Sequence, residues 1–156
     1  CSRLADLLIA KNVKIRGIIS RRIVENDNTI GYDLIEIDTH KEIPFLRLRT
    51  DENEAGIGKF TFVGDVVEQG NRIIRRYIGS NSVIFVDEVG RLELKNGGGD
   101  DALTEILPGF KGVLVMSVRK DFVHDVIEKY GISKFEIIDI EAITEEDVSL
   151  KIKSHL

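Results

Sequence analysis

The sequence predicts an α/β domain built on a largely parallel sheet. Segments with the apolar period of a strand alternate with segments that have the period of a helix, as in chains of βαβ units. Residues 83–86 (V-I-F-V) and 112–118 are short apolar runs, which is typical of strands buried on both faces of a parallel sheet. A length of 156 residues fits one such domain with a sizeable core.

Apolar periodicity and turn signals place the elements in order. The first half is expected to contain a helix at 3–10, a strand at 13–20, its antiparallel hairpin partner at 30–37, a short segment at 43–48, a brief strand at 60–63 and a helix at 66–78. The second half is expected to contain a strand ending at 87, a helix at 101–107, strands at 112–118 and 135–140 on either side of a helix at 121–130, and a last helix from 145.

Polar residues and glycines mark the element boundaries. Asp65 and Glu68 form the expected capping pair of the helix at 66–78, while Asp100 and Thr144 are expected to cap the two later helices. The sequence N-G-G-G at 96–99 predicts a flexible joint.

Composition narrows the class of protein. The chain has 22 basic and 27 acidic residues and no long basic run, so neither a nucleic-acid partner nor an anionic membrane surface is expected. The single cysteine excludes an internal disulfide framework and is typical of a reducing compartment. With no transmembrane run, a cytoplasmic location is predicted. The three histidines are scattered without ligand spacing, which favours surface positions over metal sites.

The most informative segment is V-I-F-V-D-E-V-G-R-L-E at 83–93, where an apolar strand ends in two adjacent carboxylates, Asp87 and Glu88. Ligands of parallel sheets bind beyond the carboxyl ends of the strands, and two like charges there need a cation. In P-loop nucleoside-triphosphatases such an aspartate holds Mg²⁺ and a following glutamate can orient the attacking water. An acid that merely begins a turn is the structural alternative. Gly90 and Glu93 complete the string and favour a functional Walker B motif.

A Walker B strand implies a phosphate loop of the form G-x-x-x-x-G-K-[ST], whose backbone N–H groups and lysine cradle the phosphates. Gly58-Lys59 is the only Gly-Lys candidate, but Asn53 replaces the first glycine and Phe60 replaces the Ser/Thr. Residues 56–59 (G-I-G-K) are therefore predicted to form a turn.

The start of the chain suggests where the loop belongs. Residues 3–10 are in helical register with no preceding strand, and they lead through a short turn into the strand at 13–20, as the helix after a phosphate loop does. We therefore expect residues 1–156 to form a single domain truncated at its N-terminus, with the first strand and the phosphate loop immediately before Cys1.

The order of motifs resembles the small P-loop nucleoside-triphosphatases of thermophiles and humans. The resemblance runs from about residue 3 to residue 140, and its most specific part is D-E-V-G-R-L-E-L at 87–94. It is supported by K-I-R-G-I-I-S-R at 14–21, I-G-Y-D-L-I-E-I-D-T at 30–39, G-K-F-T-F-V at 58–63 and V-L-V-M-S-V-R-K at 113–120.

This resemblance implies a RecA-like fold of three α/β/α layers and Mg²⁺-dependent hydrolysis of nucleoside 5′-triphosphates, such as ATP and GTP, to diphosphate and phosphate. Broad base tolerance is also implied. By position, Asp87 would help to hold Mg²⁺ and Glu88 would activate the water. Glu93 matches the third acid of the family and is expected to fix Arg91 or the loop.

Two residues at the end of the next strand are further candidates. Arg119 is placed to approach the γ-phosphate, where an arginine can contribute about 10³–10⁵ in rate, with a solvated strand-end cation as the alternative. Ser117 is a candidate sensor of the γ-phosphate.

The chain departs from the family pattern in two ways. Residues 97–99 are three glycines where an aromatic or apolar residue usually enters the helix, so that edge of the site is expected to be loosened. More important, without a Walker A sequence these 156 residues alone are expected to bind nucleotide poorly and to be inactive.

Two other functions stay open at this point. One is a non-hydrolysing nucleotide-binding or regulatory module. The other is a nucleotide or nucleoside kinase, which would need an acceptor pocket and lid arginines. A Rossmann dinucleotide enzyme is disfavoured because no G-x-G-x-x-G follows a first strand.

Overall fold

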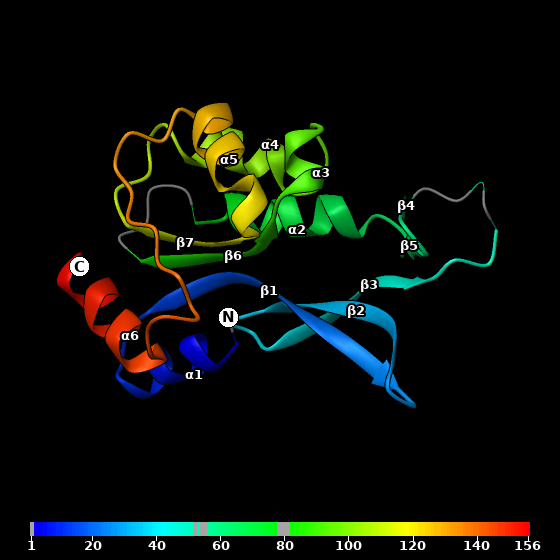
Figure 1. Cartoon of the computed structure of the whole chain (residues 1–156), viewed down its shortest axis with the longest axis horizontal. Helices are drawn as coiled ribbons and strands as arrows, with labels where there is room; N and C mark the ends of the chain where they lie inside the picture. The colour runs from blue at the N-terminus through cyan, green and yellow to red at the C-terminus, as the bar shows by residue number, and fades with distance from the viewer. Residues whose placement is uncertain (1, 52, 54–55, 78–81) are drawn as a thin grey trace.

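The computed structural model describes residues 2–51, 53, 56–77 and 82–156, which form one mixed sheet with helices on both faces (Figure 1). The strands are β1 (Ile15–Glu25), β2 (Asn28–Glu36), β3 (Lys41–Leu48), β4 (Gly56–Ile57), β5 (Phe60–Phe62), β6 (Val83–Val89) and β7 (Val113–Val118). The helices are α1 (Ser2–Ala10), α2 (Val66–Arg75), α3 (Arg91–Leu94), α4 (Asp100–Ile106), the 3₁₀ turn η1 (Lys120–Phe122), α5 (Val123–Tyr130) and α6 (Glu145–Ser154).

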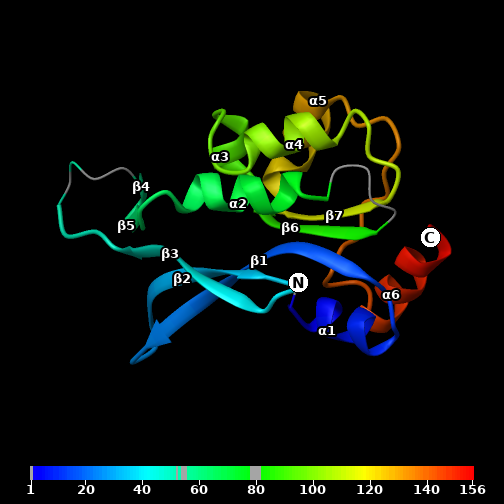
Figure 2. The ribbon, with the colours of Figure 1, turned by 180° about the vertical axis from the view of Figure 1, so that it is seen from behind.

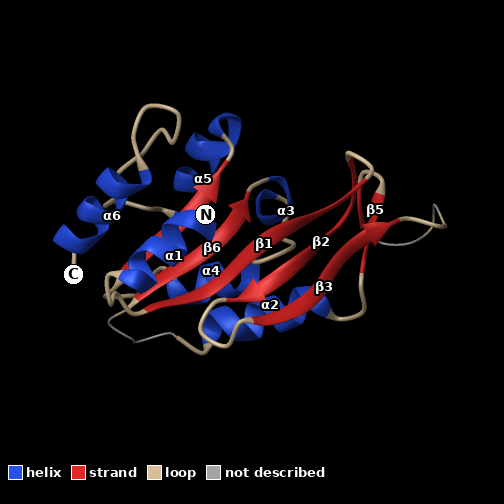
Figure 3. Cartoon of the chain, turned by 90° about the horizontal axis from the view of Figure 1, so that it is seen from below, coloured by secondary structure: helices blue, strands red, loops and turns tan. Residues whose placement is uncertain are grey.

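The strand order is β4-β5-β3-β2-β1-β6-β7, and only the β1–β6 and β6–β7 pairings are parallel (Figure 3). The prediction of a mostly parallel sheet is wrong for the described residues. The expected hairpin is confirmed, because β1 and β2 pair antiparallel. Their connection is Asn26-Asp27, both with left-handed φ, and so short a turn permits only antiparallel pairing. Beyond the hairpin, β3, β5 and β4 continue the antiparallel half.

Two hydrophobic clusters cover opposite faces of the sheet. Ile74 of α2 and Leu103 of α4 pack with Ile84 of β6 in one cluster, and Leu8 of α1 packs with Phe85 in the other. Adjacent strand residues point to opposite faces, so the run V-I-F-V supplies both clusters. Figures 1 and 2 show α2 to α5 on one side of the sheet and α1 with α6 on the other. The parallel strands are thus anchored from both faces.

Strand β7 lies at the edge of the sheet. In the described part of the chain it pairs with β6 alone, and all six of its residues are partly exposed. The strand predicted at 112–118 therefore exists but is not buried as expected, because one of its long edges has no neighbouring strand among these residues.

The strand predicted at 135–140 is wrong. Residues 135–139 have no regular secondary structure and residue 140 lies in a turn, although Phe135, Ile137 and Ile140 keep the apolar character of a strand. These three side chains are between 55% and 84% exposed. A strand requires a hydrogen-bonded neighbour, and no described strand pairs with this segment.

The structure also tests the expected caps and the G-I-G-K turn. Thr144 caps α6 through its hydroxyl, which accepts a hydrogen bond from Asp147 N–H at 3.2 Å. Asp65 precedes α2, but its carboxylate binds Gln69 and Arg72 side chains instead of a backbone N–H. Asp100 lies inside α4, whose N-cap is Gly99. Residues 58 and 59 form the predicted turn, between β4 and β5.

Among the described residues, the helices are all too short or too polar to cross a membrane.

Candidate active site

The two adjacent carboxylates lie near the carboxyl end of β6, which continues to Val89 instead of ending at residue 87 as predicted. Strand β6 lies between β1 and β7 and is parallel to both. Carboxyl ends of parallel strands meet at one edge of a sheet, and here residues near the ends of β6 and β7 meet the middle of the longer strand β1. Asp87 accepts a hydrogen bond from the backbone N–H of Ser20 on β1 at 3.1 Å. Its other oxygen accepts one from the hydroxyl of Ser117 on β7.

Ser117 connects both predicted carboxylate residues. Besides donating to Asp87, its hydroxyl oxygen accepts a hydrogen bond from the backbone N–H of Glu88 at 2.7 Å. The structure therefore brings together Asp87, Glu88 and Ser117, three of the residues singled out in the sequence. Ser117, expected as a sensor of phosphate, here orients the two acids.

Glu88 has an unusual backbone and a perturbed carboxyl. Its φ of 61° lies in the left-handed region, which costs free energy for a residue with a Cβ and is found preferentially at functional sites. The residue is exposed, yet loss of hydration around the carboxyl is the main cause that raises the pKa of Glu88 above its usual value. The negative charges of Asp87 and Glu93 raise this pKa further.

Glu93 is a buried anchor of the loops behind the site. One carboxylate oxygen accepts a hydrogen bond from Gly90 N–H at 2.8 Å, and the other accepts one from Gly99 N–H at 3.0 Å. The residue is only 7% exposed. These contacts match the loop-fixing alternative expected for Glu93. Its carboxylate contacts the loops, and Arg91 lies elsewhere, over Phe122.

The glycine run at 97–99 is held firmly, which corrects the expectation of a loosened edge. Gly98 has a φ of 58°, and a Cβ at this position would lie 2.2 Å from a Glu93 carboxylate oxygen. Asn71 of α2 donates to the Gly98 carbonyl at 2.9 Å. A glycine at 98 is thus what permits the Glu93 carboxylate to approach the backbone.

The two predicted arginines do not reach the carboxylates. Arg91 and Arg119 are both exposed, and Arg119 pairs with Asp121 at 3.2 Å. Within the described ranges neither guanidinium forms an ion pair with Asp87 or Glu88. Both instead lie near the ring of Phe122, beside the same edge of the sheet.

A family model described as NTPase matches residues 1–152. The chain belongs to this NTPase family. The family resemblance expected from the motifs is therefore confirmed, and its most specific string, Asp87 to Leu94, contains the carboxylates described above.

Several relatives of this chain carry the name nucleoside-triphosphatase THEP1. The protein of Methanocaldococcus jannaschii is 22% identical over 145 residues, which cover 92% of this chain and 84% of the relative. The protein of Saccharolobus solfataricus is 29% identical over 92 residues, which cover 59% of this chain and 52% of the relative. In the second comparison the match spans only about half of the relative's length.

Two solved structures share the fold. The solution structure of a human cancer-related nucleoside triphosphatase has a TM-score of 0.72 at 15% identity, and the match covers 98% of this chain and 89% of that one. The crystal structure of THEP1 from Aquifex aeolicus has a TM-score of 0.68 at 17% identity and covers 94% and 88%. The α/β fold of this chain is therefore shared with these two structures.

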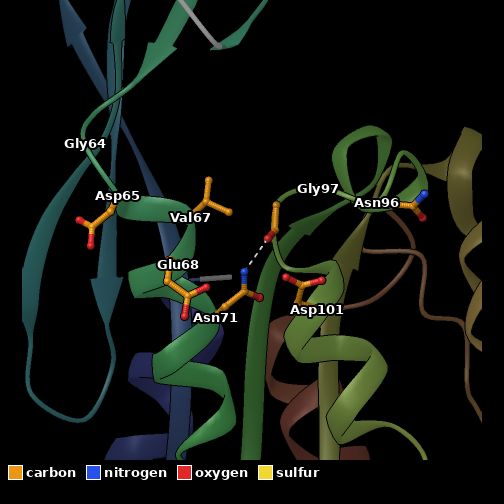
Figure 4. A pocket seen from close by; sticks show the side chains of 9 residues that line it. Gly64, Asp65, Val67, Glu68, Asn71, Asn96, Gly97 and Asp101 are labelled. Carbon is orange, nitrogen blue, oxygen red and sulfur yellow. Dashed lines mark hydrogen bonds between the residues drawn. The ribbon is translucent and has the colours of Figure 1, made fainter.

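A cavity of about 320 Å³ lies between the start of α2 and the loop that precedes α4 (Figure 4). Its lining includes the acids Asp65, Glu68 and Asp101, and the buried amide of Asn71 lies at its base. None of the site residues predicted from the sequence lines it, although the predicted capping pair Asp65 and Glu68 does. Glu93 contacts the same glycine loop by accepting the hydrogen bond from Gly99 N–H.

Three further residues support the candidate site and were not predicted from the sequence. Asn71 joins α2 to α4, because its amide also accepts from Ala102 N–H at 3.1 Å. Lys129 of α5 binds the Glu93 carbonyl and the carboxylate of Asp100. Phe122 contacts two arginines. A polar residue on the apolar face of the helix at 66–78 was the available signal for Asn71, whereas nothing local marks the other two.

Proposed function

We propose that the protein hydrolyses nucleoside 5′-triphosphates to diphosphate and phosphate, with Asp87 and Glu88 as its central acidic residues. The observation that carries the proposal is the hydroxyl of Ser117, which fixes both residues at the open carboxyl edge of parallel strands. Membership of the NTPase family supports a nucleoside triphosphate as the substrate. Broad tolerance of the base is what the resemblance to the family implies.

Glu88 is the proposed general base. Its raised pKa makes the carboxylate a stronger base than an ordinary glutamate, and its exposure gives water access to it. The carboxylate takes a proton from water as the water oxygen bonds to the γ-phosphorus. The bond from that phosphorus to the β,γ-bridging oxygen then breaks, and the nucleoside diphosphate leaves with the electron pair.

The oxygen donors present suit Mg²⁺. This ion usually binds proteins through one or two carboxylates and keeps its remaining positions for water and substrate phosphates. Asp87 with the neighbouring Ser117 hydroxyl provides such an incomplete set. No group of three His, Cys, Asp or Glu residues that could enclose a metal occurs in the described ranges. Asp87 would therefore hold Mg²⁺ together with the substrate, where the ion supplies positive charge for the phosphates.

We place the phosphate loop outside these 156 residues, because their only Gly-Lys pair is the hairpin turn at 58–59. The exposed edge of β7 and the exposed apolar side chains Phe135 and Ile137 favour one more parallel strand beside β7. Its carboxyl end would meet the same sheet edge as Asp87, so the loop that follows it would face the carboxylates.

The test is phosphate release from ATP, GTP, CTP and UTP by the complete polypeptide, that is, residues 1–156 together with the proposed G-x-x-x-x-G-K-[ST] loop. We expect release from all four in Mg²⁺ and loss of release in EDTA. Residues 1–156 alone serve as the control and are expected to release none. Absence of release from every nucleotide would contradict the proposed function, and release that persists in EDTA would contradict the role of Mg²⁺.

A further inference from the structure

One aromatic ring lies close to two arginines from different parts of the chain. The Arg91 Cζ atom is 5.9 Å from the centroid of the Phe122 ring, and the Arg119 Cζ atom is 5.4 Å from it. Arg91 begins α3 after β6, whereas Arg119 follows β7. Guanidinium groups at such distances are attracted by the ring. The ring of Phe122 thus holds two cationic side chains beside the carboxyl ends of β6 and β7, which carry the candidate site.

Phe122 is itself fixed against the loop of the carboxylates. Its ring is partly buried and packs on the larger hydrophobic cluster. A Cβ at Gly90 would lie 3.2 Å from the Cδ2 atom of Phe122, so the ring rests on the backbone of that glycine. Gly90 stands two residues after Glu88 and donates its N–H to Glu93. The position of the ring is therefore coupled to the turn that carries Glu88.

The two cations are only partly compensated. Arg119 pairs with Asp121, and both of these side chains are more than 70% exposed. Arg91 forms no ion pair within residues 2–51, 53, 56–77 and 82–156. Two like charges that share one ring repel each other, and an anion that contacts both would relieve the repulsion. Guanidinium groups match the geometry of phosphate oxygens and bind them with paired hydrogen bonds.

We propose that Phe122 is a positioning residue that holds Arg91 and Arg119 as a pair to bind the terminal phosphate of the nucleoside triphosphate. This inference rests on the proposed function. Phe122 itself does not contact the phosphate and acts only by positioning the two arginines. Because a diphosphate lacks the terminal phosphate, the pair distinguishes substrate from product. Loss of the ring weakens binding of the triphosphate selectively.

The test compares Phe122→Leu with Phe122→Tyr in the complete polypeptide, with circular dichroism as the check of folding. We expect Phe122→Leu to weaken binding of a non-hydrolysable triphosphate analogue about tenfold and to leave the affinity for the diphosphate unchanged. Phe122→Tyr keeps the ring and is expected to retain the wild-type ratio of the two affinities. Equal weakening of both ligands, or a Phe122→Tyr variant as poor as Phe122→Leu, would overturn the proposal.

A second measurement separates this proposal from the proposed function. In NMR spectra of the complete polypeptide, inorganic phosphate is expected to shift the Nε–Hε signals of Arg91 and Arg119 together in the wild type and less in Phe122→Leu. Signals that stay in place would overturn the pair even if the enzyme hydrolyses nucleotides. Conversely, a protein that hydrolyses no nucleotide but shows the paired shifts would contradict the proposed function alone.

Discussion

The Ser117 hydroxyl oxygen accepts a hydrogen bond from the backbone N–H of Glu88 at 2.7 Å, across the boundary between β7 and β6. The same hydroxyl donates its proton to Asp87. One small side chain thereby fixes the direction of the proposed metal ligand and the backbone of the proposed base. Because the two strands are neighbours only in the folded sheet, the arrangement depends on the register of β6 with β7.

Replacing Ser117 by alanine tests this arrangement. Glu88 N–H loses its acceptor and Asp87 loses a donor, so we expect the free energy of unfolding to fall by about 1–3 kcal/mol. Turnover by the complete polypeptide is expected to fall by at least about tenfold, since a misplaced base is less effective. Ser117→Thr retains the hydroxyl and is the matched control. Wild-type turnover in Ser117→Ala would show that the hydroxyl does not orient the acids.

The left-handed backbone of Glu88 predicts that glycine is more stable than alanine at this position. Glycine adopts a φ of 61° without the steric penalty of a Cβ, which is about 1–2 kcal/mol per residue. We expect Glu88→Gly to be more stable than Glu88→Ala by about 1 kcal/mol in urea denaturation. Both variants lack the carboxylate, so their difference isolates the backbone. An alanine variant as stable as the glycine variant would contradict the strained conformation.

Glu93 is predicted to be a major contributor to stability through its two backbone hydrogen bonds. Glutamine offers one oxygen and an NH₂ group, and that NH₂ group would face one of the N–H donors at Gly90 and Gly99. The expected loss for Glu93→Gln is about 1–3 kcal/mol, measured by chemical denaturation. Glu136→Gln makes the same chemical change at an exposed ion pair with Lys151 and should change stability by less than about 0.5 kcal/mol. Similar losses in both would contradict the assigned role.

Gly98 is expected to resist substitution. An alanine there would need a left-handed φ and would place its Cβ 2.2 Å from the Glu93 carboxylate, so we expect Gly98→Ala to cost about 1–3 kcal/mol. A Cβ at Gly109 would meet nothing within 4 Å, which makes Gly109→Ala a control with little effect or a small gain. Thermal unfolding of the two variants provides the comparison, and equal melting temperatures would refute the close contact.

The features that depend on a short stretch of sequence, such as the strand with the carboxylates and the first hairpin, could be predicted from the sequence. The string at 83–93 indicated a strand with two carboxylates near its carboxyl end, although the strand continues to Val89, two residues beyond the predicted end. Apolar runs and adjacent acids are visible one segment at a time. The hairpin of β1 and β2 was equally visible in its turn. The strand predicted at 135–140 failed because strand formation also depends on a partner, and apolar character alone cannot supply one.

The roles of the glycines at 97–99, Asp100 and Phe122 depend on contacts between elements that are distant in the sequence. The glycines at 97–99 indicated flexibility, whereas their actual role is to admit the Glu93 carboxylate, which depends on how α3 and α4 pack. Asp100 was expected as a helix cap, but it accepts a hydrogen bond from the Tyr130 hydroxyl at 2.7 Å. Phe122 read as an ordinary apolar residue of the helix at 121–130. Arg91, one of its two arginine neighbours, is distant in sequence and follows another strand, so no local signal marked the ring.

The central claim is that Glu88 activates the attacking water. Its most direct test is single-turnover hydrolysis of Mg²⁺-ATP by the complete polypeptide and by its Glu88→Gln variant, with ATP binding measured on the same samples. The side chain of glutamine has nearly the size and shape of the glutamate side chain, but its amide cannot accept the proton from water. We predict that Glu88→Gln binds ATP with near wild-type affinity and releases almost no phosphate. Unchanged phosphate release by Glu88→Gln would contradict the account.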